Sequence, residues 1–222
     1  MAWRKPCGGS GRRSVTSELL LLASIGAIQL LAVISPGPSF LITARTAVAQ
    51  SRADGVKVAL GLGAGTVVWS SAALLGLNAV FHAIPVLFMG MKLAGALFLL
   101  YVAVMIFRHA ADPLEIGTGG ERLPNPFLKG FLTQISNPKV AVFFGSIFIA
   151  MLPAQLSLWT TVALILMVSL NEVWWYSLVA LFFGAGPVRR AYLRAKSWID
   201  RITGLFLGAL GLRLLWSVGE GL

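Results

Sequence analysis

Ile34-Ser35-Pro36-Gly37-Pro38-Ser39 interrupts the apolar run 19–33, which is long enough to form most of a membrane-spanning helix. The two prolines carry no backbone N–H, so the carbonyls of Ala32 and Ile34 would lose their usual helical partners. The glycine between them predicts backbone angles that other residues avoid. Unpaired backbone is costly in hydrocarbon, so this break is expected to lie inside protein or to line a cavity.

A second break of the same kind occurs at Ile135-Ser136-Asn137-Pro138-Lys139, inside a later apolar segment. Its proline would free the carbonyl of Gln134. Two interrupted helices at corresponding points in two halves of a chain indicate the binding site of a transporter.

The composition excludes a soluble domain. Hydrophobic residues make up 57% of the 222 residues and charged residues only 12%, too few charges to cover a soluble surface. The net charge of +10 comes from basic residues between apolar runs, where they set topology and meet lipid headgroups, so nucleic acid is not an expected partner. The single cysteine, Cys7, excludes an intramolecular disulfide and a thiol-pair redox relay.

The apolar pattern predicts an all-α polytopic membrane protein with six transmembrane helices. The segments are about 17–35, 57–80, 86–107, 128–151, 156–184 and 199–217. A polar connection at 109–127 divides one transporter domain, 17–222, into halves of about 17–108 and 128–218. Three crossings per half require two inverted three-helix repeats, with helices 1 and 4 broken.

Residues 1–16 are basic and rich in glycine and serine, which predicts a disordered tail. A signal peptide is the weaker interpretation, because the Pro-Gly-Pro break falls where a small-residue cleavage site is expected.

Lysine and arginine counts predict the orientation. Eleven such residues fall at the first, third and fifth connections, and six on the opposite side. The positive-inside rule therefore places these three connections in the cytoplasm and both termini in the periplasm, although the basic tail argues the other way.

The two breaks supply the candidate substrate-binding residues. Unwound backbone presents carbonyls to a cation, and a helix that resumes presents amides to an anion, so the breaks suit a zwitterion such as a free amino acid. A plain proline kink is the alternative. The candidates are Ser35, Pro36, Gly37, Pro38, Ser39, Asn137, Pro138 and Asn171.

Two ionisable residues fall within predicted spans. Glu172 could exchange a proton or pair with a substrate ammonium, and Lys139 could be its ion-pair partner. The alternatives are a structural ion pair, a glutamate nearer the interface, and a lysine that reaches the headgroups.

Other residues and the motifs that are missing limit the kinds of function that the sequence predicts. Arg52 and Asp54, in the first basic loop, could brace a gate or simply be solvated. No cluster of histidine, cysteine and carboxylate predicts a metal, and no protease or nucleotide-binding motif predicts an enzyme or a cofactor. The Gly61-x-x-x-Gly65 pattern allows helices to approach closely and permits, without requiring, a homodimer.

These residues together resemble the lysine exporter and homoserine–threonine exporter (LysE/RhtB) family over about residues 18–217. Besides the first break, the resemblance rests on Ser51-Arg52-Ala53-Asp54-Gly55, on 92–101, on Gly130-Phe131-Leu132-Thr133-Gln134-Ile135-Ser136-Asn137-Pro138-Lys139, on Trp175-Tyr176-Ser177-Leu178-Val179-Ala180 and on Arg201-Ile202-Thr203-Gly204. One departure is Phe98, where the family has a tyrosine whose hydroxyl could contact substrate.

The resemblance implies a secondary transporter in the bacterial inner membrane. It would export a small amino acid, threonine-like, homoserine-like or basic, with proton antiport as the usual proposal. A passive small-solute channel remains the alternative. A membrane scaffold or redox protein with the same helices is a further alternative, although a redox carrier would lack a thiol pair.

Overall fold

The computed structural model describes residues 15–83, 85–113, 124–153, 155–183 and 185–219. All regular secondary structure in these ranges is α-helical, which confirms an all-α polytopic membrane protein. Residues 1–14 of the expected disordered tail lie outside the described ranges, and residues 15 and 16 already belong to the first helix. Five helical segments are long and apolar enough to cross a membrane: Val15–Ile34, Arg52–Gly76, Met89–Arg108, Leu158–Phe182 and Gly186–Gly219.

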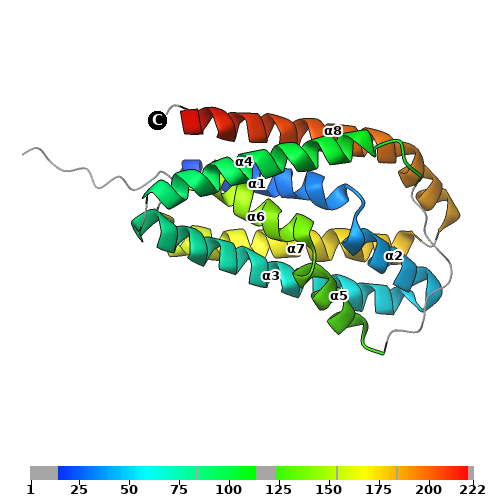
Figure 1. Cartoon of the computed structure of the whole chain (residues 1–222). Coiled ribbons are helices and arrows are strands. Elements are labelled where there is room, and N and C mark those ends of the chain that lie inside the picture. Colours follow the sequence, from blue (N-terminus) through cyan, green and yellow to red (C-terminus); the bar gives the residue numbers. More distant parts are fainter. Residues whose placement is uncertain (1–14, 84, 114–123, 154, 184, 220–222) are drawn as a thin grey trace, which may run out of the picture.

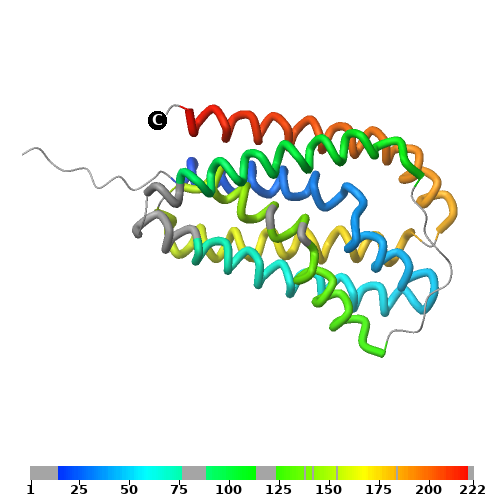
Figure 2. The backbone as a smooth tube through the Cα atoms, in the orientation of Figure 1, coloured from blue at the N-terminus to red at the C-terminus, as the bar shows by residue number. Residues whose placement is uncertain are grey.

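The helices run side by side in an elongated bundle (Figure 1). The described elements are α1 (Val15–Ile34), α2 (Pro38–Ala49), α3 (Arg52–Ala83), α4 (Pro85–Arg108), α5 (Pro126–Ile135), α6 (Pro138–Met151), α7 (Leu158–Phe182) and α8 (Gly186–Gly219). Helix α4 packs along α8, and α3 packs against both α5 and α7. The backbone trace in Figure 2 shows the chain turning between α1 and α2, and again between α5 and α6, near the middle of the bundle.

Prolines end one helix and begin the next at both turns. Pro38 and Pro138 occupy the start of α2 and α6, where an N–H would have no helical partner in any case. Gly37 precedes α2 with φ −160° and ψ −168°. This is extended backbone that any residue can adopt, so the expectation of glycine-specific angles is wrong.

Two basic segments expected to be loops are helical. Helix α8 has 34 residues, a length of about 51 Å, so it exceeds a hydrocarbon core of about 30 Å and carries the basic stretch 189–201 within it.

Arg52 and Asp54 lie in the first turn of α3 rather than in a loop. Asp54 accepts a hydrogen bond from the Ser51 hydroxyl (2.7 Å), and its own N–H donates to Ser51 Oγ (3.0 Å). Such reciprocal bonds cap a helix start.

Glycines allow α3 and α5 to touch along their backbones. A Cβ on Gly61 would collide with the carbonyl oxygen of Phe127, and one on Gly65 would lie 2.6 Å from Gln134 Cβ. From the other side, a Cβ on Gly130 would collide with the carbonyl oxygen of Val58. The Gly61-x-x-x-Gly65 pattern, which predicted close helix packing, therefore allows α5 to pack closely beside α3.

Gly61→Ala should destabilise the protein strongly, because its new methyl group meets backbone atoms that no side-chain rotation can move. We expect a lower melting temperature in detergent and less monodisperse protein. Gly76→Ala is the matched control, since a Cβ there meets nothing within 4 Å and alanine is the better helix former. Equal behaviour of the two variants would contradict the close approach.

Candidate functional site

The two helix interruptions are hydrogen-bonded to each other. Ser39, in the first turn of α2, donates through its hydroxyl to Gln134 Oε1 (2.7 Å). Asn137, between α5 and α6, donates through Nδ2 to Ser39 Oγ (3.2 Å). Gln134 in turn donates to Thr66 Oγ1 on α3 (2.8 Å). Segments about 95 residues apart in sequence therefore form one polar cluster in the centre of an apolar bundle.

The carbonyls freed by the first pair of prolines receive donors from distant helices. Lys139 Nζ donates to the carbonyl oxygens of Ala32 (3.2 Å) and Ser35 (3.4 Å). The Tyr192 hydroxyl, from α8, donates to the carbonyl of Ile34 (2.9 Å). Lys139 thus points toward the end of α1 and not toward a headgroup layer.

The main-chain carbonyls at the second interruption also receive hydrogen-bond donors from distant side chains. Trp69 on α3 directs Nε1 at the carbonyl oxygens of Gln134 (3.2 Å) and Ile135 (3.3 Å). Asn137 caps α6, with Oδ1 accepting the N–H of Lys139 (3.1 Å). Helix α2, by contrast, has no side-chain cap at its N-terminus.

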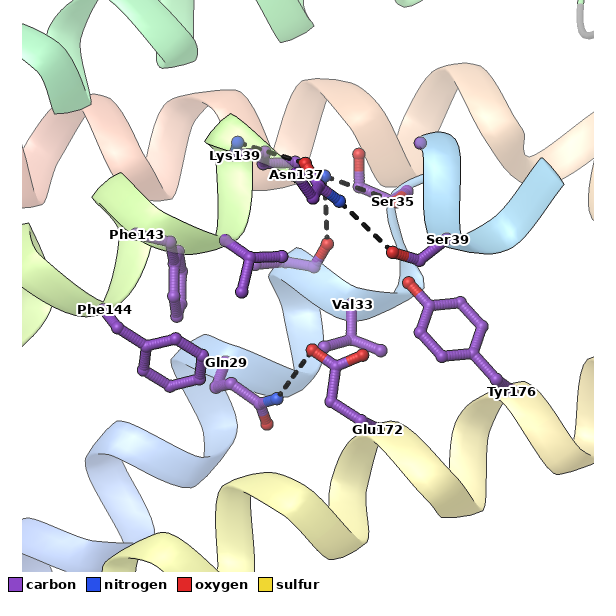
Figure 3. Close-up of a pocket in the computed structure, with 13 residues that line it drawn as sticks. Gln29, Val33, Ser35, Ser39, Asn137, Lys139, Phe143, Phe144, Glu172 and Tyr176 are labelled. Carbon is purple, nitrogen blue, oxygen red and sulfur yellow. Dashed lines mark hydrogen bonds between the residues drawn. The ribbon is translucent and has the colours of Figure 1, made fainter. Parts of the chain in front are cut away.

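A small cavity lies between the interruptions and α7 (Figure 3). Its volume is about 30 Å³, room for one or two water molecules. Its wall combines charged and amide groups with aromatic rings, so it offers both polar partners and an apolar surface. The lining residues are Gln29, Ala32, Val33, Ser35, Gly37, Ser39, Asn137, Lys139, Val140, Phe143, Phe144, Glu172 and Tyr176.

Glu172 is the acidic group of this cavity. Its side chain comes from the middle of α7, is 4% exposed, and faces Gln29 and Tyr176 (Figure 3). Gln29 Nε2 donates weakly to Oε1 (3.4 Å), while Oε2 has no hydrogen-bond partner among the described residues. A buried carboxyl oxygen without a partner is expensive, so it indicates a place that a proton or a cationic group occupies.

Gln29 is held in position from two sides. It donates to the carbonyl of Val168 (3.1 Å), and its Oε1 accepts from Asn171 Nδ2 (2.8 Å). Asn171 also donates to the carbonyl of Gly26 (3.3 Å). Asn171 is therefore placed behind Gln29 and is not part of the cavity wall.

The structure brings together six of the residues that the sequence singled out. Ser35, Gly37, Ser39, Asn137, Lys139 and Glu172 all line the cavity.

The other candidates lie elsewhere. Pro36 faces a second cavity, Pro38 starts α2, and Asn171 supports Gln29. The side chain of Pro138 lies outside the described residues. Arg52 and Asp54 belong to the capped start of α3 and are not among the lining residues of either cavity, and their role in bracing a gate stays a prediction.

Several contributing residues were missed from the sequence. Gln29 is a polar residue in the middle of the first apolar run, and that position was the available signal. Tyr176 lies in one of the motifs that carry the family resemblance, and this was its available signal. Trp69 resembles an ordinary aromatic residue in a membrane segment, so its local sequence does not distinguish it. Tyr192 was assigned to a loop. Phe98 is not among the lining residues of either cavity, so its missing hydroxyl is not a direct contact there.

Comparison with known proteins agrees with this geometry. The family model described as LysE type translocator matches residues 30–218. The chain belongs to this family. It is therefore a multi-pass membrane transporter and not an enzyme, and the resemblance drawn from the sequence is confirmed.

Individual relatives cover most of the chain. The threonine efflux protein of Escherichia coli K12 is 29% identical over 208 residues, which are 90% of this chain and 99% of the relative. The threonine efflux protein of Salmonella typhi is 29% identical over 204 residues, with the same coverage. The leucine efflux protein of Enterobacter sp. strain 638 is 27% identical over 180 residues, 80% of this chain and 85% of the relative. No solved structure matches the chain.

Tyr192→Phe should lower the melting temperature, because the Ile34 carbonyl loses its donor while the ring stays packed against Phe40. An unsatisfied buried carbonyl costs about 1–3 kcal/mol. The matched control is Tyr101→Phe, since Tyr101 is 59% exposed. Thermal unfolding of both variants in the same detergent tests this; an unchanged melting temperature for Tyr192→Phe would show that the carbonyl does not need this donor.

Proposed function

We propose that this transporter exports a small amino acid from the cytoplasm, and that the cavity between the two interruptions is its central substrate site. The observation that carries the proposal is the unpartnered Oε2 of Glu172 in that cavity, with Lys139 in the same wall. The names of the relatives, threonine efflux and leucine efflux proteins, support an amino acid as the substrate.

The charges of the site suit a zwitterion. A substrate ammonium would pair with Glu172, the acidic residue of the wall. Its carboxylate would lie near Gly37 and the uncapped N-terminus of α2, where amide groups favour an anion. Because Lys139 already contributes a cation, a neutral side chain is favoured over a basic one.

The empty cavity is too small for an amino acid, so the site must widen to bind. A volume of about 30 Å³ is far below the several hundred Å³ typical of ligand sites. The hydrogen bonds that join the interruptions, from Ser39 to Gln134 and Asn137, would have to rearrange. We assign the present conformation to a closed state of the carrier.

We propose six membrane crossings in two inverted three-helix repeats. Helices α1 and α2 together form one interrupted crossing, and α5 and α6 form the other. The C-terminal ends of α2, α4 and α7 and the N-terminal ends of α3, α5 and α8 lie at one end of the bundle (Figure 1), and this end carries most of the basic residues. The positive-inside rule then makes it the cytoplasmic end, with the termini in the periplasm of a bacterial inner membrane.

Glu172 is proposed to couple transport to protons. It would take up a proton when the site faces the periplasm and release it when the site faces the cytoplasm, so that inward proton flow drives export. Glu172→Gln keeps the shape of the side chain but cannot exchange a proton. Export of L-threonine from proteoliposomes carrying this variant should lose its stimulation by a proton gradient, which the wild type retains.

The control for this measurement is Glu18→Gln, which makes the same charge change near the start of α1, outside the cavity. It should export with wild-type pH dependence. Unchanged export and unchanged pH dependence in Glu172→Gln would remove Glu172 from the mechanism.

The substrate can be identified by counting radiolabelled amino acids out of preloaded cells. We expect export of L-threonine or L-leucine to exceed that of L-lysine, because the cavity already contains Lys139. Preloaded vesicles should show counterflow, which a carrier produces. Absence of counterflow, with flux that ignores the proton gradient, would indicate a passive channel instead.

A further inference from the structure

A second, larger cavity lies on the other side of the first interruption. Its volume is about 340 Å³. It is lined by residues of the turn between α1 and α2, of the C-terminal end of α4 with the residues just after it, and of the first half of α8. The residues that matter here are Ser35, Pro36, His109, Asp112, Lys196 and Asp200.

The size of this cavity distinguishes it from the central one. A volume of about 340 Å³ falls within the range of small-molecule sites, about 300–1,000 Å³. In the present conformation it is therefore the cavity with room for a free amino acid.

A buried charge pair forms one wall. Lys196 Nζ lies 3.1 Å from Asp200 Oδ2, and the two side chains are only 10% and 7% exposed. Lys196 also donates to the carbonyl oxygens of His109 (3.1 Å) and Ala110 (3.2 Å) at the end of α4. The lysine is thus tied to two helices, whereas the other oxygen of Asp200, Oδ1, accepts from the Ser35 hydroxyl (2.8 Å).

Ser35 lies between the two cavities, because it is a lining residue of both, and it is called the partition below. On one side its hydroxyl bonds Asp200, and on the other its carbonyl accepts from Lys139 Nζ (3.4 Å). Ser35 therefore links Asp200 to the wall of the central cavity.

A free amino acid carries an ammonium group and a carboxylate group on one carbon. Its ammonium can therefore pair with an aspartate while its carboxylate pairs with a neighbouring lysine. A substrate ammonium at Asp200 would compete with the Ser35 hydroxyl for the same carboxylate. Asp112, at the exposed rim of the cavity, adds a negative charge beside the opening.

We propose that this cavity is an entrance site for the free amino acid: Asp200 takes its ammonium group, Lys196 takes its carboxylate, and release of Ser35 from Asp200 opens the partition. This inference rests on the proposed function, because it supplies the site that substrate occupies before the central cavity.

Equilibrium binding of radiolabelled L-threonine and L-leucine to the purified protein in nanodiscs tests the site. Asp200→Asn should weaken binding by about tenfold or more, because it removes the charged partner of the ammonium. Glu18→Gln, which removes a negative charge outside both cavities, should stay within about threefold of the wild type. The melting temperature of each variant is measured alongside.

Binding and export, measured on the same variants, separate the two proposals. Wild-type binding by a folded Asp200→Asn variant, when the wild type exports the amino acid, would overturn the entrance site alone. Failure of the wild type to bind or export either amino acid would overturn both.

The partition is tested independently of binding. In a Cys7→Ser background, Val33→Cys places a thiol in the central cavity. Adding Ser35→Ala, which leaves the Asp200–Lys196 pair intact, should raise the rate of modification by a water-soluble thiol reagent several-fold. An unchanged modification rate would show that Ser35 does not close the passage between the two cavities. The Ser35→Ala variant also tests the proposal if Asp200→Asn fails to fold.

Discussion

The hydrogen bonding of a few main-chain carbonyls governs the architecture of this transporter. Prolines at two points in the chain remove helical donors where water is scarce, and each freed carbonyl must then find another partner. Lys139, Tyr192 and Trp69 supply these partners from helices far away in sequence. The same bonds that satisfy the backbone therefore join α6 and α8 to the end of α1, and α3 to the end of α5.

This arrangement places polar groups where a substrate can use them. Satisfying the end of α1 with a lysine puts a cation beside the cavity, and Glu172 on α7 lies in the opposite part of the wall. The uncapped start of α2 adds backbone amides. The fold and the site are therefore linked, because Lys139, one of the donors to the freed carbonyls, is also part of the cavity wall.

The sequence predicted what depends on local pattern. Apolar runs predicted helical segments, prolines predicted the turns before α2 and α6, and isolated charges in apolar runs drew attention to Glu172 and Lys139, which line the central cavity. The arrangement of six crossings in two repeats stays a proposal. It did not predict which distant side chains would bond the freed carbonyls, because Trp69 and Tyr192 differ from neighbouring aromatic residues only in where packing puts them. The basic stretch 189–201 was mistaken for a loop because charge density ends a membrane span but does not end a helix. Asp200 was overlooked within that stretch for the same reason.

The small volume of the central cavity affects how well the membrane can keep its proton gradient. A bacterial membrane protein with buried acids and waters can let protons slip across and dissipate the gradient that drives other processes. In the proposed mechanism, a central space of about 30 Å³ would hold only a few water molecules. The interlocked interruptions would then limit proton leak at this point of the bundle while the site is closed.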